Sequence, residues 1–436
     1  MTAEVTAWLA ANAVPLDSLT AGSPTGDLEP LKRTLDGVRV VGLGEATHGT
    51  REFFLLKHRL LEFLVTEMGF SVLAMEASAS AGLAVDQYVL HGTGEAADVL
   101  ARLGFWTWRT YEVLAMIEWM RAYNRGVPDD KPDDKKVRFV GIDPQRCGDS
   151  ITVLDAFLRA AAPERAAAFR AGLGGLADAT PGAPLAARRQ WLRDTQELVG
   201  YLERDAAELT ELTSATRVDE ARRHARLVVR AADVVSRPPH HEAPERSALV
   251  ARDRYMAEAV AELLDRDDAA KVALWAHNGH IMTGHYGGGV PAAGRHLRQR
   301  YGEAYYGLGL LFGKGAFRAC RGGRRALARP ASAPRRPVRN TIGAAGSDFV
   351  EAKLSEASAG SHMVNLRTDG DAPPTVEQWL RESHSQRSFG AYVPRFVYRL
   401  SSMPTVLAEE YDGLVFIPES TCSRPLPPLP GKASPA

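Results

Sequence analysis

The sequence predicts an α/β fold with a mostly parallel central sheet flanked by helices. Four short runs rich in strand-forming residues are apolar throughout rather than alternating, as expected for strands buried on both faces of a parallel sheet. Patterns typical of helices separate them, and alternating strands and helices are the signature of this fold class. The four runs span residues 38–45, 71–78, 137–144 and 271–280.

The helical patterns between the first three runs have the expected spacing and ends. Residues 51–68 place apolar side chains at i, i+3 and i+4, from Phe53 to Met68, and Gly69 follows where a C′ glycine is preferred. Residues 111–123 repeat the pattern. Both segments are therefore predicted to be helices that join parallel strands.

The chain divides into four parts by composition. Residues 1–149 form the first part of the α/β core, and residues 150–268, rich in Ala, Arg, Glu and Leu, are predicted to be a helical insertion. Such an insertion over a sheet often forms one wall of a cleft, so we expect a lid or wall role, with simple scaffolding as the alternative. Residues 269–425 complete the core, and the Pro-rich residues 426–436 are predicted to be a disordered tail.

The last third returns to strand-like pieces around one basic stretch. Residues 314–347 hold nine Lys or Arg and no acid. We interpret them as a solvated loop, with an anion- or substrate-contacting loop as the alternative. The strand-like pieces are residues 304–313, 361–368, 391–396 and 411–420.

Composition excludes several classes of protein. The chain has 436 residues, is 45% hydrophobic, and carries 53 basic and 53 acidic residues, whereas nucleic-acid binders usually show a basic excess. Its three cysteines, Cys147, Cys320 and Cys422, make neither a disulfide framework nor a CxxC site. We see no signal peptide and no apolar run long enough to span a membrane. We therefore expect a cytoplasmic monomer or homodimer without nucleic-acid or membrane partners.

Each of the four predicted strands ends in side chains that can do chemistry. The carboxyl ends of parallel strands lie at one edge of a sheet, where ligands bind. A buried carboxylate is costly unless it is paired, so four such ends indicate a site, although each residue alone could be a structural turn or ion-pair residue. The residues are Glu45 with His48, then Glu76, then Asp143, then His277 with His280.

These residue types allow two chemistries. A histidine oriented by a carboxylate can take a proton from water, and further histidines can stabilise an oxyanion formed at a carbonyl. The motifs of serine-elbow hydrolases, P-loops and HExxH metalloproteases are absent. Alternatively, His48, His277, His280 and Glu76 could hold zinc or manganese. No cofactor is required for the first chemistry, and a divalent metal is the open alternative.

Two other segments have both a structural and a functional interpretation. In FWTWRTYEV, Trp106, Trp108 and Tyr111 either pack in the core or line the cleft, where Arg109 would meet a carbonyl or carboxylate. The charged residues 252–254 either form ion pairs that support the site or belong to a solvated helix face.

Several motifs, in order, resemble the erythromycin esterase family. They are GEATHGTREFF-LLKHRLLEFLV (44–65), GFSVLAMEA (69–77), FWTWRTYEVLAMIEWMRAYN (105–124), FVGIDPQ (139–145), ARDRYMAE (251–258), LWAHNGHI (274–281) and YDGLVFIPEST (411–421). The resemblance runs from about residue 35 to residue 421. It implies an α/β core, a helical region and a deep cleft between them.

The resemblance also implies roles. His48 matches the general base for water, Glu45 and Glu76 match carboxylates that assist it, and His277 and His280 match the downstream histidines of the site. Lys57 stands where some macrolide-resistance members have arginine. The residues expected to contact substrate are Lys57, Trp106, Trp108, Arg109, Tyr111 and Asp143.

We therefore expect a hydrolase that cleaves a carboxylic ester or macrolactone with water activated by His48. Its partner would be a small-molecule ester, lactone or peptide-like natural product. One alternative is a natural-product or peptide tailoring enzyme that uses the same groups for amide hydrolysis, isomerisation or epimerisation. Another is a metal- or haem-binding protein without hydrolytic activity.

Overall fold

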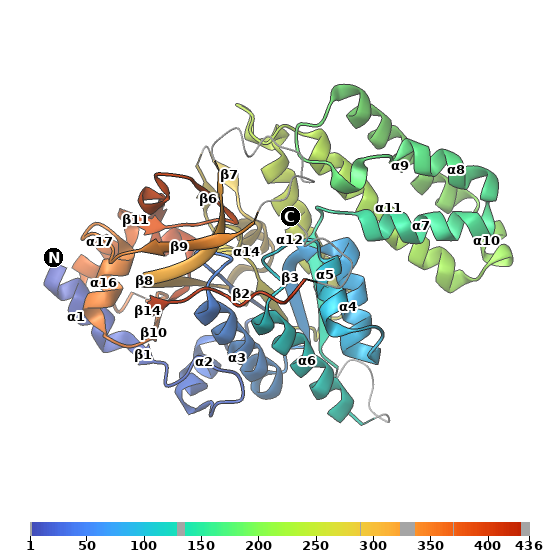
Figure 1. The fold of residues 1–436 in the computed structure, drawn as a ribbon. Helices are drawn as coiled ribbons and strands as arrows, with labels where there is room; N and C mark the ends of the chain where they lie inside the picture. The colour runs from blue at the N-terminus through green and yellow to red at the C-terminus, as the bar shows by residue number, and fades with distance from the viewer. Residues whose placement is uncertain (1, 129–135, 288, 323–335, 369, 429–436) are drawn as a thin grey trace.

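A computed structural model of the chain describes residues 2–128, 136–287, 289–322, 336–368 and 370–428 (Figure 1). The strands are β1 (Ala13–Pro15), β2 (Val40–Leu43), β3 (Val72–Ser78), β4 (Arg138–Asp143), β5 (Val272–Trp275), β6 (His285–Tyr286), β7 (Val290–Pro291), β8 (Tyr305–Gly322), β9 (Val338–Ile342), β10 (His362–Asn365), β11 (Ser383–Arg387), β12 (Tyr392–Pro394), β13 (Ser402–Val406) and β14 (Gly413–Ser420).

The main sheet is mostly parallel. Its strand order is β1-β10-β14-β8-β2-β5-β3-β4, with β9 and β12 paired to β8. From β14 to β4 each neighbouring pair is parallel, and only β10, β1 and β9 run antiparallel to their neighbours. The α/β prediction is confirmed, and the four apolar runs of the sequence form the adjacent strands β2, β5, β3 and β4.

Helices lie on both faces of this sheet and in the segment between β4 and β5. They are α1 (Thr2–Asn12), α2 (Glu29–Thr34), α3 (Arg51–Met68), α4 (Ala79–His91), α5 (Ala96–Arg102), α6 (Tyr111–Gly126), α7 (Gly148–Ala161), α8 (Pro163–Gly172), α9 (Leu185–Arg204), α10 (Ala206–Leu212), α11 (Ala215–Ser236), α12 (Ala248–Arg266), α13 (Asn278–Ile281), α14 (Ala293–Tyr301), α16 (Val350–Ala357), α17 (Pro374–Arg381) and α18 (Leu407–Glu410). Figure 1 shows α3 and α6 on one face and α12 and α14 on the other. The predicted glycine end of α3 is present, because Gly69 caps it with φ 72°.

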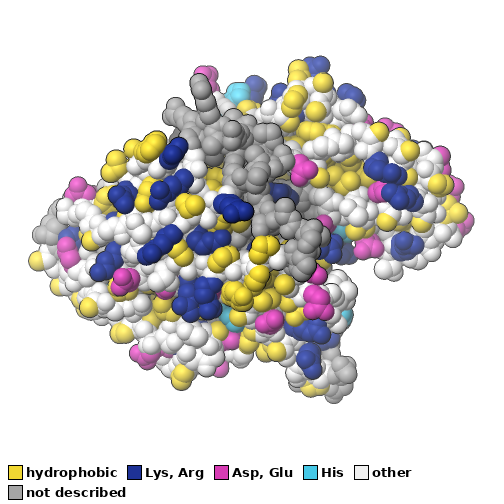
Figure 2. Space-filling view, in the orientation of Figure 1, with side chains coloured by type: hydrophobic (Ala, Val, Ile, Leu, Met, Phe, Trp, Pro, Cys, Tyr) yellow, Lys and Arg dark blue, Asp and Glu magenta, His cyan; other side chains and the backbone are white. Residues whose placement is uncertain are grey.

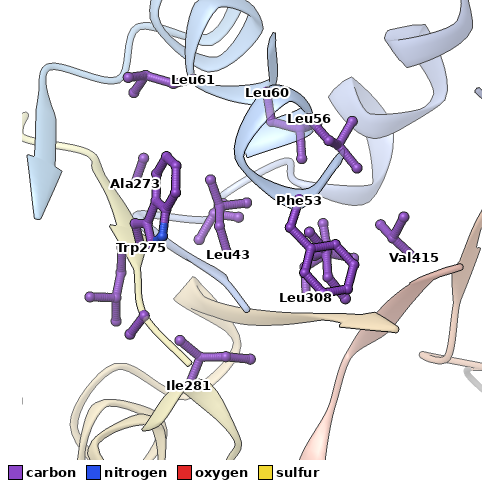
Figure 3. Packing of buried hydrophobic residues seen from close by; sticks show 14 of the residues in the cluster. Leu43, Phe53, Leu56, Leu60, Leu61, Ala273, Trp275, Ile281, Leu308 and Val415 are labelled. Atoms are coloured by element: carbon purple, nitrogen blue, oxygen red, sulfur yellow. The ribbon is translucent and has the colours of Figure 1, made fainter. Parts of the chain in front are cut away.

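The core of the main body lies between the sheet and these helices. Figure 3 shows Phe53 and Leu56 of α3 pointing toward Leu43 of β2 and Leu308 of β8. All four side chains are almost completely buried. The apolar face of α3 therefore packs on the centre of the sheet, which sets the position of the loop between β2 and α3.

The segment between β4 and β5 is helical and has two parts. Helices α7 to α11 share a hydrophobic core of their own, whose buried residues run from Cys147 to Val235. Figure 1 shows these helices as a lobe that projects from the main body. Helix α12 belongs to the main core instead, because Met256, Val260 and Leu264 pack in the main cluster.

The interpretation of residues 314–347 as a solvated loop is wrong at both ends. Strand β8 continues to Gly322, and β9 pairs antiparallel with it from Gly315 to Ala319. Within β8, Phe317 and Cys320 are buried while Lys314 and Arg321 are exposed. These basic residues therefore belong to a strand and not to a loop. Residues 323–335 lie outside the described residues. Figure 2 shows Lys and Arg side chains on the face that contains β8 and β9.

Leu426, the first residue of the predicted disordered tail, packs on the protein. It is buried against the main core, and its backbone N–H donates to the carbonyl of Arg109 at 3.1 Å. Residues 429–436 lie outside the described residues. Within the described part of the chain, no helix is long and apolar enough to cross a membrane.

Candidate active site

The ends of four adjacent parallel strands meet at one pocket. Glu45 follows β2, His277 follows β5, Glu76 lies near the end of β3, and Asp143 is the last residue of β4. These strands are neighbours in the sheet, so their carboxyl ends share one edge, as the sequence predicted. The pocket has a volume of about 370 Å³. It is lined by His48, Glu76, Phe105, Trp106, Thr107, Trp108, Asp143, Gln145, Arg146, Leu249, Arg252, His277, His280, Tyr286, Gly390, Ala391 and Tyr392.

Glu45 holds the imidazole ring of His48 in position. The Nδ1 atom of His48 lies 2.7 Å from Oε1 of Glu45, whose side chain is completely buried. The other carboxylate oxygen accepts from Nζ of Lys57 at 2.7 Å and from Nε1 of Trp275 at 3.0 Å. Because the carboxylate is acceptor-only, the neutral ring of His48 carries its proton on Nδ1 and its lone pair on Nε2. His48 lines the pocket, so this arrangement suits a base that acts on a group bound there.

Lys57 supports Glu45 and does not line the pocket. Its side chain is 0% exposed, and its ammonium group lies 4.6 Å from the ring centroid of Trp275. Burial lowers the pKa of Lys57 to about 8, against the opposing effect of Glu45. The expectation that Lys57 contacts substrate is therefore not met in the structure. The reason is that α3 turns this position toward Glu45, in the interior.

His277 presents a hydrogen-bond donor to the pocket. Burial, followed by the charge of His48, lowers the pKa of His277 to about 3, so the ring is neutral at physiological pH. Its Nδ1 accepts from the backbone N–H of Gly279 at 3.1 Å, which leaves the ring proton on Nε2. Among the described residues this buried Nε2 has no hydrogen-bond partner. The rings of His277 and His48 are 5.1 Å apart, so a donor and a base face the same small space.

Arg252 is the central cation of the site. Its Nη2 lies 2.7 Å from Oε1 of Glu76 and 2.8 Å from Oδ2 of Asp143, and both carboxylates are buried. Glu76 also accepts from the backbone N–H of His277 at 2.8 Å, which joins the ion pairs to β5. Burial alone would raise the pKa of Glu76, but the charges of His280, His48 and Arg252 outweigh it and hold this pKa well below its usual range. The ion pairs of Arg252 thus connect helix α12 to the ends of β3 and β4.

His280 is held as a cation between two carboxylates. Its Nδ1 lies 2.9 Å from Asp253 and its Nε2 lies 3.2 Å from Glu76. Burial alone would lower the pKa of His280, but Asp253 and Glu76 outweigh it and raise it to about 9. Nη1 of Arg252 lies 2.9 Å from the same Nε2. With His280 protonated, its Nε2 and Nη1 of Arg252 both carry hydrogens. Glu76 contacts both cations and stabilises them side by side.

Only part of the aromatic stretch after α5 lines the pocket. Trp106 and Trp108 line the pocket, and the ring of Trp108 lies edge-on to His48 at 5.7 Å. Arg109 and Tyr111 do not line it. Arg109 donates to the carbonyl of Pro427, and Tyr111 is 43% exposed beneath Arg424. The expected substrate contacts of these two residues are therefore absent from this pocket, because the backbone turns away at Thr110, the N-cap of α6.

The helical lobe does not supply the wall expected of it at this pocket. From residues 150–268 only Leu249 and Arg252 line the pocket, and both belong to α12. In the described part of the chain, α7 to α11 contribute no lining residue to it.

The alternative metal ligands do not form a metal-binding group. His280 uses both ring nitrogens, His48 uses Nδ1 for Glu45, and Glu76 is bonded to Arg252 and His277. Across the described ranges no group of three or more His, Cys, Asp or Glu is arranged to hold a metal ion. The positive charge beside these carboxylates is supplied by Arg252 and His280.

Sequence reasoning missed two residues of the site, Tyr286 and Arg146, and left the role of Arg252 and Asp253 open. For the run 252–254 it allowed either ion pairs that support the site or a solvated helix face, and the structure shows ion pairs for Arg252 and Asp253. Tyr286, whose hydroxyl lies 2.7 Å from Nδ1 of His280, stands in a glycine-rich stretch that carries no catalytic motif. Arg146 follows Asp143 in a strand-ending turn that carried no motif. Of these residues, only those of the charged run 252–254 could have been found from the sequence, because this run lies in the helix that leads directly into a core strand.

Comparisons with known proteins identify the family. Residues 65–420 match the family model for erythromycin esterase, a range that includes Glu76 and His277 but starts after Glu45 and His48. The chain is 34% identical over 124 residues to erythromycin esterase type II of Escherichia coli, an alignment that covers 28% of each chain. It is 24% identical to YbfO of Bacillus subtilis (strain 168) over 95% of this chain and 91% of that one.

A solved structure shares the fold. A histidine-to-asparagine mutant of the erythromycin esterase EreC, in its open conformation, superposes with a TM-score of 0.68 and 20% identity over 94% of this chain and 98% of that one. The family model confirms the resemblance seen in the motifs over residues 65–420. The chain belongs to the erythromycin esterase family.

Proposed function

We propose that this protein is a hydrolase that cleaves a small-molecule carboxylic ester or lactone with water activated by His48. Family membership indicates a hydrolase, and the site supports the finer assignment. The observation that carries it is the pairing of His48, whose Nδ1 is bonded to Glu45, with the neutral donor His277 beside it.

The reaction follows from these two groups. Water bound at Nε2 of His48 gives up a proton to that nitrogen and attacks the carbonyl carbon. The Nε2–H of His277 donates to the carbonyl oxygen as negative charge develops on it. When the C–O bond of the ester breaks, His48 returns the proton to the leaving oxygen. Glu45 stabilises the imidazolium that exists between the two proton transfers.

The remaining ionic groups hold this pair in place. Glu76 fixes the backbone of His277, and Arg252 and His280 neutralise Glu76. Trp106 and Trp108 supply an apolar surface beside His48, which suits the hydrocarbon part of an ester or lactone.

The test compares purified wild-type protein with His48→Ala on a panel of simple esters and macrolactones, with products analysed by mass spectrometry. We expect products heavier than substrate by one water, and loss of turnover in a variant that keeps its circular dichroism spectrum. His241→Ala, which changes an exposed histidine outside the pocket, should keep full activity. Wild-type-like turnover by His48→Ala would disprove the mechanism, and a product of unchanged mass would favour isomerisation.

A further inference from the structure

Arg146 is a cation of the pocket without a counter-ion. It follows β4, is half-buried, and lines the same pocket as His48 and His277. Its guanidinium group stacks on Phe105, with 4.9 Å from Cζ to the ring centroid. This guanidinium group forms no ion pair or hydrogen bond with any residue that the structure describes. Arg252, by contrast, is paired with two carboxylates.

The backbone of Arg146 adopts an uncommon conformation. Its φ is 59°, the left-handed region, which no other described residue except glycines enters. This conformation is unfavourable by about 1–2 kcal/mol for a residue with a side chain and persists only where the surroundings hold it. The hydroxyl of Ser78 does so by donating to the carbonyl of Arg146 at 2.8 Å.

A second feature makes room for the side chain. Gly104 lies beneath Arg146, and a Cβ at that position would come within 2.9 Å of Cδ of Arg146. Gly104 itself has φ 76°, so a larger residue is disfavoured there on both grounds. The strand end, Ser78 and Gly104 together direct this guanidinium toward the pocket.

We propose that Arg146 binds an oxyanion group of the substrate, a carboxylate or a phosphate, so that the preferred substrate is an anionic ester or lactone. The inference rests on the proposed function. A guanidinium binds such groups through two parallel hydrogen bonds and remains charged at every physiological pH. The acids of the pocket do not oppose an anion, because the two cations Arg252 and His280 balance the charges of Glu76 and Asp143. In a pocket of about 370 Å³, the anionic group and the reacting carbonyl must belong to one compact molecule.

The activity test uses matched 4-nitrophenyl esters, the monoester of glutaric acid against the neutral butyrate ester. We expect the wild type to favour the anionic ester in kcat/KM. Arg146→Met should lower this preference, the ratio of kcat/KM for the anionic ester to that for the neutral ester, by about 10- to 100-fold, as for loss of a charge-assisted hydrogen bond. Arg146→Lys should restore part of the preference. Methionine and lysine carry the same backbone strain, so a folding defect would affect both variants and both esters. Arg300→Met removes an exposed arginine paired with Asp265 and serves as the control.

A binding test separates this inference from the proposed function. Glutarate, glutaramide and inorganic phosphate are titrated against wild type and Arg146→Met by calorimetry, which needs no turnover. Tighter binding of glutarate than of glutaramide in the wild type, lost in the variant, supports the inference even if neither ester is hydrolysed. Tighter binding of phosphate than of glutarate would identify a phosphate as the anionic group. An ester preference and an anion affinity that are both unchanged in Arg146→Met would overturn the inference.

Discussion

Replacing Arg252 with methionine should lower the free energy of unfolding by about 3 kcal/mol at neutral pH. The substitution leaves Glu76 and Asp143, 5% and 1% exposed, without the cation that lies 2.7 and 2.8 Å from them. Removing one partner of a buried ion pair costs about 3–5 kcal/mol. We expect the lower end, because Glu76 keeps His280 and Asp143 keeps the backbone N–H of Gln145 at 3.0 Å.

Arg254 provides a control on the same helix. Its side chain is 45% exposed and lies 4.0 Å from Asp233 and 3.8 Å from Glu258. Exposed pairs of this kind contribute about 0–1 kcal/mol. Arg254→Met therefore removes the same charge and the same volume with little loss, and the two variants should differ by about 2 kcal/mol or more.

Urea unfolding followed by tryptophan fluorescence measures this difference, because Trp108 and Trp275 lie in the main core beside the site. The pH dependence gives a second check. The folded pKa of Glu76 is held below its ordinary value of 4.5, so its contribution to stability is present above pH 4.5 and is lost as pH falls through the folded pKa. The deficit of Arg252→Met should therefore narrow as the pH falls below about 4.5. A deficit equal to that of Arg254→Met at neutral pH would refute the role of Arg252 as the central cation.

Two further predictions concern the histidines. The folded pKa of His280, about 9, exceeds its ordinary value of 6.5, so its contribution to stability is full below pH 6.5 and is lost as pH rises through 9. The stability deficit of His280→Gln should therefore be largest near pH 6 and smallest near pH 10 in urea titrations, and a deficit independent of pH would contradict this. His277→Ala should lower kcat by about 100-fold or more, as for an oxyanion donor, without moving the midpoint of the pH–rate profile, because the pKa of His277 is about 3. A raised KM with unchanged kcat would instead show that His277 only binds substrate.

The strands and their chemical ends were predictable from local sequence. Continuous apolar runs are typical of strands buried on both faces, and each run stops at a polar residue that a buried strand does not need. Parallel strands share one edge for their carboxyl ends, so the meeting of Glu45, Glu76, Asp143 and His277 followed before any packing was known. The fold class and the family motifs were available for the same reason, since both depend on short contiguous segments.

Side-chain direction was not predictable in this way. Lys57 lies within α3, and Tyr111 is the first residue of α6. The helical period does not say which turn of a helix faces the pocket. Lys57 is buried against Glu45, whereas Tyr111 faces solvent beneath Arg424. The basic residues of β8 likewise concealed a strand, because pairing with β14 and β9 is made by segments far away in the sequence.

The sequence by itself determined the four central strands, the helices α3 and α6 that join them, and the polar groups that end these strands at the pocket. Only the tertiary structure decided which charges pair there, because Arg252 reaches Glu76 and Asp143 across separations of 176 and 109 residues. A carboxylate at a strand end requires some partner, since its burial is otherwise too costly, but the local pattern does not identify that partner. The packing of α12 on the main core supplies it. Among the described residues the guanidinium of Arg146 has no such partner, although it lines the same pocket.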